Sequence, residues 1–212
     1  MRKIFGLVLI LVFVFVLSEK ANANLITNGS FEKENYNISN FKTLYSGSTL
    51  IPGWTVIDGE IDWIGGYWSA SDGDKSLDMN GCLPGTILSD SFNTNPGKKY
   101  HVTFDMAGNP GNSNHTQKTL TLTIGNYTKT FTFDTSGHTK ANMGWQQKSY
   151  FFIATLATTQ LKFSGDSSAG CCGPALDNVV VTEVQNSVPE PATALLLFTG
   201  LGLIPLVRRK RK

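Results

Sequence analysis

The middle of the sequence lacks arginine. Between residues 24 and 187 the positive charge comes from 10 lysines, against 14 acidic residues, so this part carries a net charge of −4 although the whole chain carries +2. The other basic residues lie near the two ends of the chain. Because contacts to nucleic-acid phosphates normally require a basic patch, this distribution argues against a nucleic-acid partner.

Histidines and catalytic motifs are also scarce. The chain has 3 histidines, His101, His115 and His138, and none belongs to a Gly-x-Ser-x-Gly or His-Glu-x-x-His motif. Asp72 and Asp74 lie close together on one loop, whereas a glycosidase needs two carboxyls on opposite sides of the sugar. These shortages predict a protein that is not an enzyme.

Long apolar runs occur only at the two ends of the chain. Near the start, a basic pair precedes an apolar stretch over residues 4–17, and small residues follow around Ala23. This stretch is shorter than the roughly 20 residues that span a bilayer as a helix. We therefore expect residues 1–23 to be a signal peptide that signal peptidase removes between Ala23 and Asn24. An uncleaved anchor helix is the alternative.

The other end combines three features in a fixed order. Pro189-Glu190-Pro191 precede an apolar segment over residues 192–207, and the basic residues 208–212 close the chain. A helix over that segment would reach only about 24 Å, which makes a poor permanent anchor. The tail over residues 188–212 resembles the PEP-CTERM sorting signal. The resemblance implies processing by an exosortase near Pro-Glu-Pro and only transient contact with the membrane.

The three cysteines, Cys82, Cys171 and Cys172, cannot all pair within one chain. Export favours oxidation, so we expect one disulfide from Cys82 to either Cys171 or Cys172, and both alternatives stay open. A structural zinc site takes about four Cys or His ligands, which this set does not supply.

Short runs of alternating or β-branched residues, separated by Gly, Asn, Asp and Pro, dominate the chain from residue 50 onward. Residues 100–106 put their apolar side chains on one face of a strand. Residues 120–124 and 131–133, joined through Gly125-Asn126, predict a hairpin. The other expected strands cover residues 49–57, 61–64, 76–79, 86–92, 147–154, 160–163 and 176–184.

Such strands without an amphipathic helix predict an all-β fold, a two-sheet antiparallel jelly-roll sandwich. The sequence thus divides into a signal peptide (1–23), one β-sandwich domain (24–187) and a sorting tail (188–212). The apolar segments at the two ends predict a flanking N-terminal signal helix and a flanking C-terminal hydrophobic helix.

Several segments of the expected domain resemble known families. The opening residues 24–32 are similar to the start of galactose-binding-like jelly rolls, which include many carbohydrate-binding modules. Together with Pro52-Gly53-Trp54, residues 71–81 and residues 173–179, they resemble the choice-of-anchor C family, whose members carry interchangeable surface-sorting tails. The resemblance implies an extracellular role associated with polysaccharide.

The same resemblance implies a structural calcium that ties the N-terminal loop to the last strand. Glu32 and Asp177 match the acidic positions of those two segments. Calcium takes about six to eight oxygens, so carbonyls near Asn28 and the loop at Asp74 would complete its shell. The alternative is that Glu32 and Asp177 cap turns or accept hydrogen bonds from backbone amides.

Sugar binding would depend on flat aromatic rings with polar groups beside them. Tyr67 and Trp68 lie in a loop rich in glycine and serine and are the expected stacking residues. Asn109 and Asn112 are the expected hydrogen-bonding residues of a neighbouring loop. A loop aromatic that folds back over the core is the alternative at each ring.

These features together predict a secreted or cell-surface protein that is not an enzyme and that binds extracellular polysaccharide or belongs to an extracellular matrix, as in a biofilm. A structural surface protein without affinity for glycans is the first alternative, and a polysaccharide-active enzyme is the second.

Overall fold

The computed structural model describes residues 23–33, 36–165 and 168–185 of the chain. These residues form β-strands and no α-helix, which confirms the all-β prediction. Within these ranges no helix is long and apolar enough to cross a membrane. The expected signal helix, the hydrophobic tail helix and the Pro-Glu-Pro motif lie outside the described residues.

The strands alternate with turns along the whole described chain. In chain order they are β1 (Phe41–Tyr45), β2 (Trp54–Asp58), β3 (Glu60–Ile64), β4 (Ser76–Asp78), β5 (Thr86–Ser89), β6 (Phe92–Asn93), β7 (Lys99–Gly108), β8 (Gln117–Ile124), β9 (Tyr127–Asp134), β10 (Gln146–Ile153), β11 (Thr158–Thr159), β12 (Lys162–Ser164) and β13 (Pro174–Glu183).

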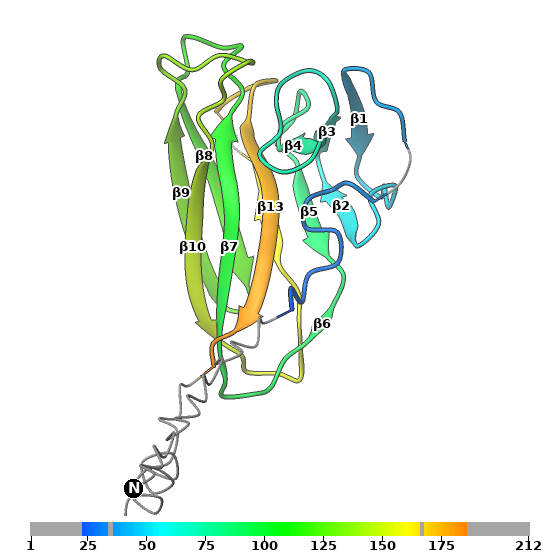
Figure 1. Cartoon of the computed structure of the whole chain (residues 1–212), viewed down its shortest axis with the longest axis vertical. Helices are drawn as coiled ribbons and strands as arrows, with labels where there is room; N and C mark the ends of the chain where they lie inside the picture. The colour runs from blue at the N-terminus through cyan, green and yellow to red at the C-terminus, as the bar shows by residue number, and fades with distance from the viewer. Residues whose placement is uncertain (1–22, 34–35, 166–167, 186–212) are drawn as a thin grey trace, which may run out of the picture.

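The strands form two facing antiparallel sheets, as Figure 1 shows. One sheet has the order β1-β3-β4-β13-β7-β10, and the other has the order β2-β5-β12-β8-β9. The short strands β6 and β11 pair separately. Neighbours in each sheet are mostly distant in the sequence, and this antiparallel jelly-roll arrangement is the predicted fold class.

The hydrophobic core lies between the two sheets. The four alternating side chains of β7 that the sequence placed inside are at most 1% exposed, and they are Tyr100, Val102, Phe104 and Met106. Phe104 packs edge-on against Phe163 of the opposite sheet, with ring centroids 5.1 Å apart. The predicted hairpin is also confirmed, because Gly125-Asn126 joins β8 to β9 and Gly125 adopts a left-handed φ of 54° that favours glycine.

Two strand predictions need correction, and one strand was missed. The run over residues 86–92 is divided between β5 and β6, which pair in different sheets. The run over residues 49–57 becomes a strand only at Trp54, because Pro52 and Gly53 form a turn that the Trp54 N–H closes on the Ile51 carbonyl. Strand β1 was not predicted, although its side chains alternate between the two faces of the sheet. Strand β1 forms part of the site described below.

The first and last described residues lie at the same end of the sandwich (Figure 1). Leu25 donates its N–H to the Val181 carbonyl at 2.9 Å, and the Asn24 side chain bonds the backbone of Val179 and Val181. Asn24, the expected first residue of the mature protein, is therefore already fixed along β13.

Candidate ligand-binding cleft

Three neighbouring strands of the six-stranded sheet direct polar side chains away from the core. In β3, Trp63 is fully buried in the core while Asp62 lies on the opposite face. Asp62 is the register partner of Thr43 in β1 and of Asp78 in β4. The three side chains therefore form one row across the outer face of the sheet.

A cleft of about 360 Å³ opens over this row, and we call it the β1–β3–β4 cleft. It is lined by Phe41, Thr43, Tyr45, Glu60, Asp62, Ile64, Tyr67, Asp78, Gly81, Cys82, Asn109, Cys171 and Cys172. The rings of Phe41 and Tyr45 are 46% and 64% exposed. Flat exposed rings beside convergent polar groups are the usual composition of a sugar-binding surface.

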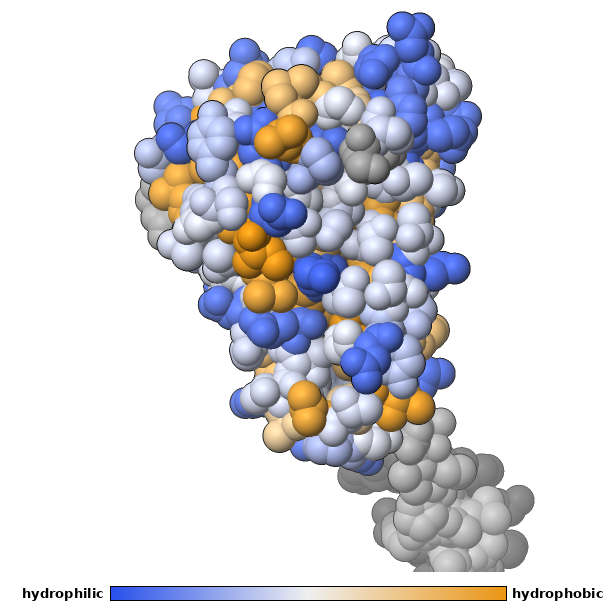
Figure 2. Space-filling view, turned by 180° about the vertical axis from the view of Figure 1, so that it is seen from behind, coloured by the Kyte–Doolittle hydropathy of each residue, from blue (hydrophilic) through white to orange (hydrophobic). Residues whose placement is uncertain are grey.

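A second hollow of about 450 Å³ lies between the β8–β9 turn and the segment after β10. Tyr127, Ile153 and Leu156 line it, and Lys162 is the one charged residue among its lining residues. Figure 2 shows, for the face behind that of Figure 1, that apolar residues form separate spots among hydrophilic ones. This hollow is lined by hydroxyl and amide groups without a carboxylate, whereas the β1–β3–β4 cleft combines several aromatic rings with carboxylates and is the better candidate.

Asp62 is the most available carboxylate of the cleft. The Thr43 hydroxyl donates a hydrogen bond of 2.6 Å to Asp62 Oδ1. Burial raises the pKa of Asp62, the Thr43 bond lowers it, and the nearby charge of Glu60 raises it. Glu60 itself accepts the backbone N–H groups of Cys82 and Leu83 through Oε1.

Asp78 is held more firmly than Asp62. Its Oδ2 accepts a hydrogen bond of 2.8 Å from Asn109 Nδ2, and its Oδ1 accepts the N–H groups of Asn80 and Gly173. Asp78 is 1% exposed, and burial raises its pKa to about 7 against the opposing effect of these donors. Asp78 therefore orders the floor of the cleft more than it meets a ligand.

All three cysteines line the same cleft. The neighbouring Cys171 thiol is the main cause that raises the pKa of Cys82 to about 11. Burial and the charge of Asp78 raise the pKa of Cys172. The disulfide stays a prediction, and this arrangement favours Cys171 over Cys172 as the partner of Cys82.

The four expected sugar-binding residues have different surroundings. Tyr67 and Asn109 line the cleft, although Asn109 is 4% exposed and bonds Asp78. Asn112 is absent from the lining, and its Oδ1 accepts the N–H of Asn114. Trp68 is 4% exposed, so the expectation that its ring is open to solvent is wrong.

Trp68 is buried because the loop from Gly65 to Lys75 folds back over the sheet. Its indole N–H donates to Ser76 Oγ at 2.8 Å. The ring of the neighbouring Tyr67 packs edge-on against Phe41, and the ammonium of Lys140 lies 3.5 Å from the centroid of the Tyr67 ring. Tyr67 is thus held at the border of the cleft by its neighbours.

The same loop is clamped by the two residues expected to bind calcium. Asp177 is fully buried, and its carboxylate accepts the N–H groups of Ser71, Asp72 and Asn178 at 2.7 to 2.9 Å. Burial raises the pKa of Asp177 to about 7. Asn178 adopts φ 48° at the bulge of β13, a conformation that asparagine tolerates better than most residues.

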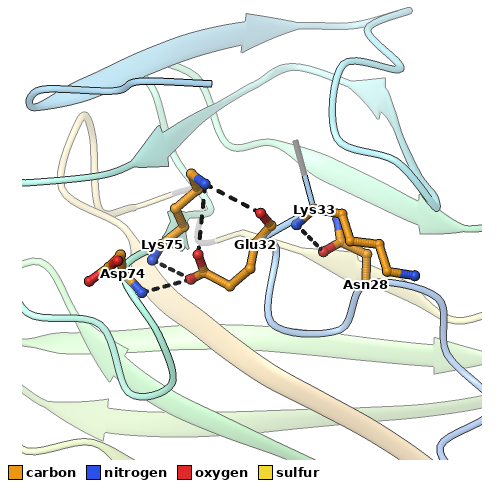
Figure 3. Close-up of polar contacts among 5 residues, drawn as sticks. All are labelled: Asn28, Glu32, Lys33, Asp74 and Lys75. Atoms are coloured by element: carbon orange, nitrogen blue, oxygen red, sulfur yellow. Dashed lines mark hydrogen bonds and ion pairs between the residues drawn. The ribbon is translucent and has the colours of Figure 1, made fainter. Parts of the chain in front are cut away.

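Glu32 completes the clamp at the far end of the loop, as Figure 3 shows. Its Oε1 accepts the N–H groups of Asp74 and Lys75, at 2.8 and 2.5 Å, and its Oε2 lies 3.7 Å from Lys75 Nζ. The described ranges contain no group of three or more His, Cys, Asp or Glu residues arranged to hold a metal ion. Calcium binding by Glu32, Asp74 and Asp177 stays a prediction.

The sequence reasoning missed the residues that form most of the cleft. Phe41, Thr43 and Tyr45 alternate along β1 and would have indicated a strand with an aromatic outer face. Glu60 and Asp62 alternate in the same way along β3. In each strand the signal spans only five residues, which is weak beside the longer patterns of β7 and β8.

The sequence profile of the family described as "Protein of unknown function (DUF642)" matches residues 24–182. Halomucin of Haloquadratum walsbyi is 31% identical to the chain over 183 residues, which is 84% of this chain and 2% of halomucin. The chain therefore spans a small fraction of that relative.

Solved structures with similar folds include an arabinose-bound α-L-arabinofuranosidase, with a TM-score of 0.52 and 10% identity over 76% of this chain and 26% of that chain. A family 16 carbohydrate-binding module has a TM-score of 0.48 and 15% identity, covering 76% of this chain and all of that chain (100%). At these identities the likeness concerns the fold alone.

Proposed function

Because the chain belongs to the DUF642 family, whose function is unknown, we propose a function from its cleft: it is a non-enzymatic protein that binds extracellular polysaccharide. The observation that carries the proposal is the row of Phe41, Tyr45 and Tyr67 rings beside Asp62 and Glu60 in one open cleft. Rings pack on the C–H faces of a sugar while carboxylates accept bonds from its hydroxyls.

Tyr45 is the residue we expect a sugar to contact first. It is 64% exposed at the end of β1, and Glu60 is its register partner on β3. Strand β1 lies at the edge of its sheet, so a polymer can run past Tyr45 without meeting a further strand. An edge position suits a chain-like ligand better than a compact one.

The surroundings of the cleft carboxylates favour binding of a glycan over its hydrolysis. A glycosidase pair requires an acid and a second carboxylate that both reach the sugar. Asp78 is 1% exposed, and both of its oxygens already accept N–H bonds. Asp62 and Glu60 can both reach a ligand, but they lie two residues apart on one strand and face it from the same side, whereas a glycosidase pair flanks the sugar from both sides, so we propose that the protein holds its glycan unchanged.

The same proposal includes how the protein is processed and where it is located. We expect signal peptidase to release Asn24 as the first residue, and an exosortase to process the tail near Pro189-Glu190-Pro191. The resemblances to the choice-of-anchor C family and to the PEP-CTERM signal support a location at the cell surface or in the extracellular matrix. Intact-mass measurement of protein recovered from cells or medium tests both cleavages.

The test of the binding function is a glycan array probed with the purified full chain and with Tyr45→Ala. We expect loss of a stacking ring to weaken binding about tenfold, as is typical for an aromatic contact of about 1.4 kcal/mol. Tyr127→Ala is the matched control, since Tyr127 is a strand tyrosine, 41% exposed, of the opposite sheet.

A structural surface protein is the competing interpretation. It predicts no retained glycan on the array, or retention that Tyr45→Ala and Tyr127→Ala lower equally. Release of reducing sugar from a bound polymer would instead identify an enzyme and contradict the non-enzymatic part of the proposal.

A further inference from the structure

The charged groups of the β1–β3–β4 cleft are all of one sign. Its lining residues include the carboxylates of Glu60, Asp62 and Asp78 and no lysine, arginine or histidine. We propose that the glycan held in this cleft carries free amino groups, so that its class is a cationic amino-sugar polysaccharide. This inference rests on the function proposed above and narrows it to one kind of ligand.

Two lysines near the cleft lie outside its lining. Lys140 lies at the rim with its ammonium over the Tyr67 ring, 3.5 Å from the centroid. Lys118 is fully buried. The positive charges of both lysines lower the pKa of Cys172, which lines the cleft. Neither lysine lines the cleft, so Glu60, Asp62 and Asp78 are the charged residues among its lining residues.

Asp62 has a free position for an ammonium group. Its Oδ1 accepts the Thr43 hydroxyl, and no donor among the described residues bonds its Oδ2. Burial and the neighbouring Glu60 both penalise the charged form of Asp62. An amine of the ligand would offset that penalty, because an opposite charge within a few ångströms favours the ionised carboxylate.

The rings are placed to hold a sugar on either side of that amine. Thr43, the partner of Asp62, lies midway along β1 between Phe41 and Tyr45. The Cα atoms of these two aromatic residues are about 14 Å apart along an extended strand, which leaves room for more than one sugar ring. Aromatic faces also attract ammonium groups, so the rings and the carboxylate favour the same ligand.

The same charges reject glycans built from uronic acids. Each carboxylate of such a polymer would meet Glu60 and Asp62 with no cation between them, and like charges in a partly buried site are costly. A neutral glycan would keep the ring contacts and lose the charge pair. The expected order of affinity is therefore cationic, then neutral, then anionic.

The experiment measures binding of the purified full chain to three immobilised hexasaccharides at fixed pH and salt. The three probes are hexamers of glucosamine, of N-acetylglucosamine and of galacturonic acid, which are cationic, neutral and anionic; the first two share their ring stereochemistry, so their comparison tests the charge most directly. We expect the glucosamine hexamer to bind about tenfold more tightly than its N-acetylated form, the effect of one charged hydrogen bond. We expect the galacturonic acid hexamer not to bind.

Asp62→Asn separates the charge from the shape of the site. The variant keeps an oxygen for the Thr43 hydroxyl and removes the negative charge, so the preference for glucosamine over N-acetylglucosamine should fall below about threefold, because only glucosamine loses a charge pair. Asp90→Asn is the matched control, because Asp90 is an exposed aspartate outside the cleft. Added salt should weaken glucosamine binding and leave N-acetylglucosamine binding unchanged.

The outcomes distinguish the two proposals. If the N-acetylated hexamer binds as tightly as glucosamine and Tyr45→Ala weakens both, the glycan-binding function stands and the amino-sugar inference is wrong. If galacturonic acid binds best, the inference is wrong as well. If no hexamer binds, or Tyr45→Ala changes nothing, the glycan-binding function itself fails.

Discussion

Asp177 and Asp62 lie on the same face of the six-stranded sheet, but they differ in burial and in the number of hydrogen bonds that they accept. Asp177 is fully buried and accepts N–H groups from Ser71, Asp72 and Asn178. Asp62 accepts one hydroxyl, from Thr43, and borders an open cleft. The first carboxylate meets its hydrogen-bonding needs within the protein, whereas the second leaves an oxygen for a ligand.

The difference comes from the loop between β3 and β4. Residues 65–75 are fixed over Asp177 by Asp177 and Glu32, and of this loop Tyr67 alone lines the cleft that contains Asp62. A carboxylate in a recognisable motif can therefore be structural, while one in an inconspicuous strand can face the ligand. The following predictions test whether the surroundings of Asp177 determine stability while the β1–β3–β4 cleft with Asp62 determines binding.

The largest expected effect is on the cleft side, where the cysteines lie. We expect exported protein to contain a Cys82–Cys171 disulfide, which closes a loop of about 90 residues and stabilises the fold by about 4 kcal/mol in the loop-entropy account. A reductant should then lower Tm by about 8 to 16 °C for a domain of this size.

Cys82→Ser should remove this response to reductant, and Cys172→Ser should leave it intact. Peptide mapping without reduction identifies the bonded pair. Three free thiols in exported protein, or a bridge to Cys172, would contradict the assignment.

The next prediction compares variants of the two aspartates: one should lower the stability of the fold and the other should lower glycan binding. Asp177→Ala leaves three backbone N–H groups without their acceptor and should cost about 3 kcal/mol, or about 6 to 12 °C in Tm. Asp62→Ala should cost less than about 1 kcal/mol and should weaken glycan binding instead. Thermal unfolding and the hexasaccharide assay, run on both variants, check this separation. A destabilised Asp62→Ala with normal binding would reverse the roles.

A smaller effect concerns pH. Burial raises the pKa of Asp78 and of Asp177 from 3.8 to about 7, so the folded protein binds more protons than the unfolded chain between these values. Stability should therefore fall as pH rises from about 4 to about 7 and level off above that range, by at least about 1 kcal/mol. Denaturant unfolding at pH 5 and pH 8 measures this. Greater stability at pH 8 would show that other groups dominate.

The long elements of the fold could be predicted from the sequence because their patterns are long. β7 alternates from Lys99 to Met106 and β8 from Gln117 to Ile124, and these strands contain the predicted runs 100–106 and 120–124. β1 spans five residues, of which Leu44 alone is buried in the core, so its pattern carries little signal. An edge strand needs only one buried side to pair, and such a strand is easily taken for a loop.

The candidate site was harder to predict than the fold because it depends on register. Tyr67 and Asn109 were identified and lie in the cleft, but Thr43 and Asp62 become neighbours only when β1 pairs with β3. Trp68 illustrates the opposite error. Its loop composition indicated exposure, while the backbone bonds that fold the loop over the sheet come from Asp177, more than 100 residues away in the chain.

Calcium is expected to have the smallest effect on the stability of the fold. Glu32 and Asp177 match the acidic positions that a calcium would need, but their oxygens already accept backbone N–H groups of the 71–75 loop. An ion at Glu32, Asp74 and Asp177 would have to replace those bonds, so its net gain should be below about 1 kcal/mol and the Tm shift below about 4 °C. Melting curves with calcium and with a chelator measure the shift, and Asp74→Asn should abolish whatever shift exists. A rise of 10 °C or more would mean that the loop opens to form a true metal site, and the clamp described for Asp177 would then be the metal-free arrangement.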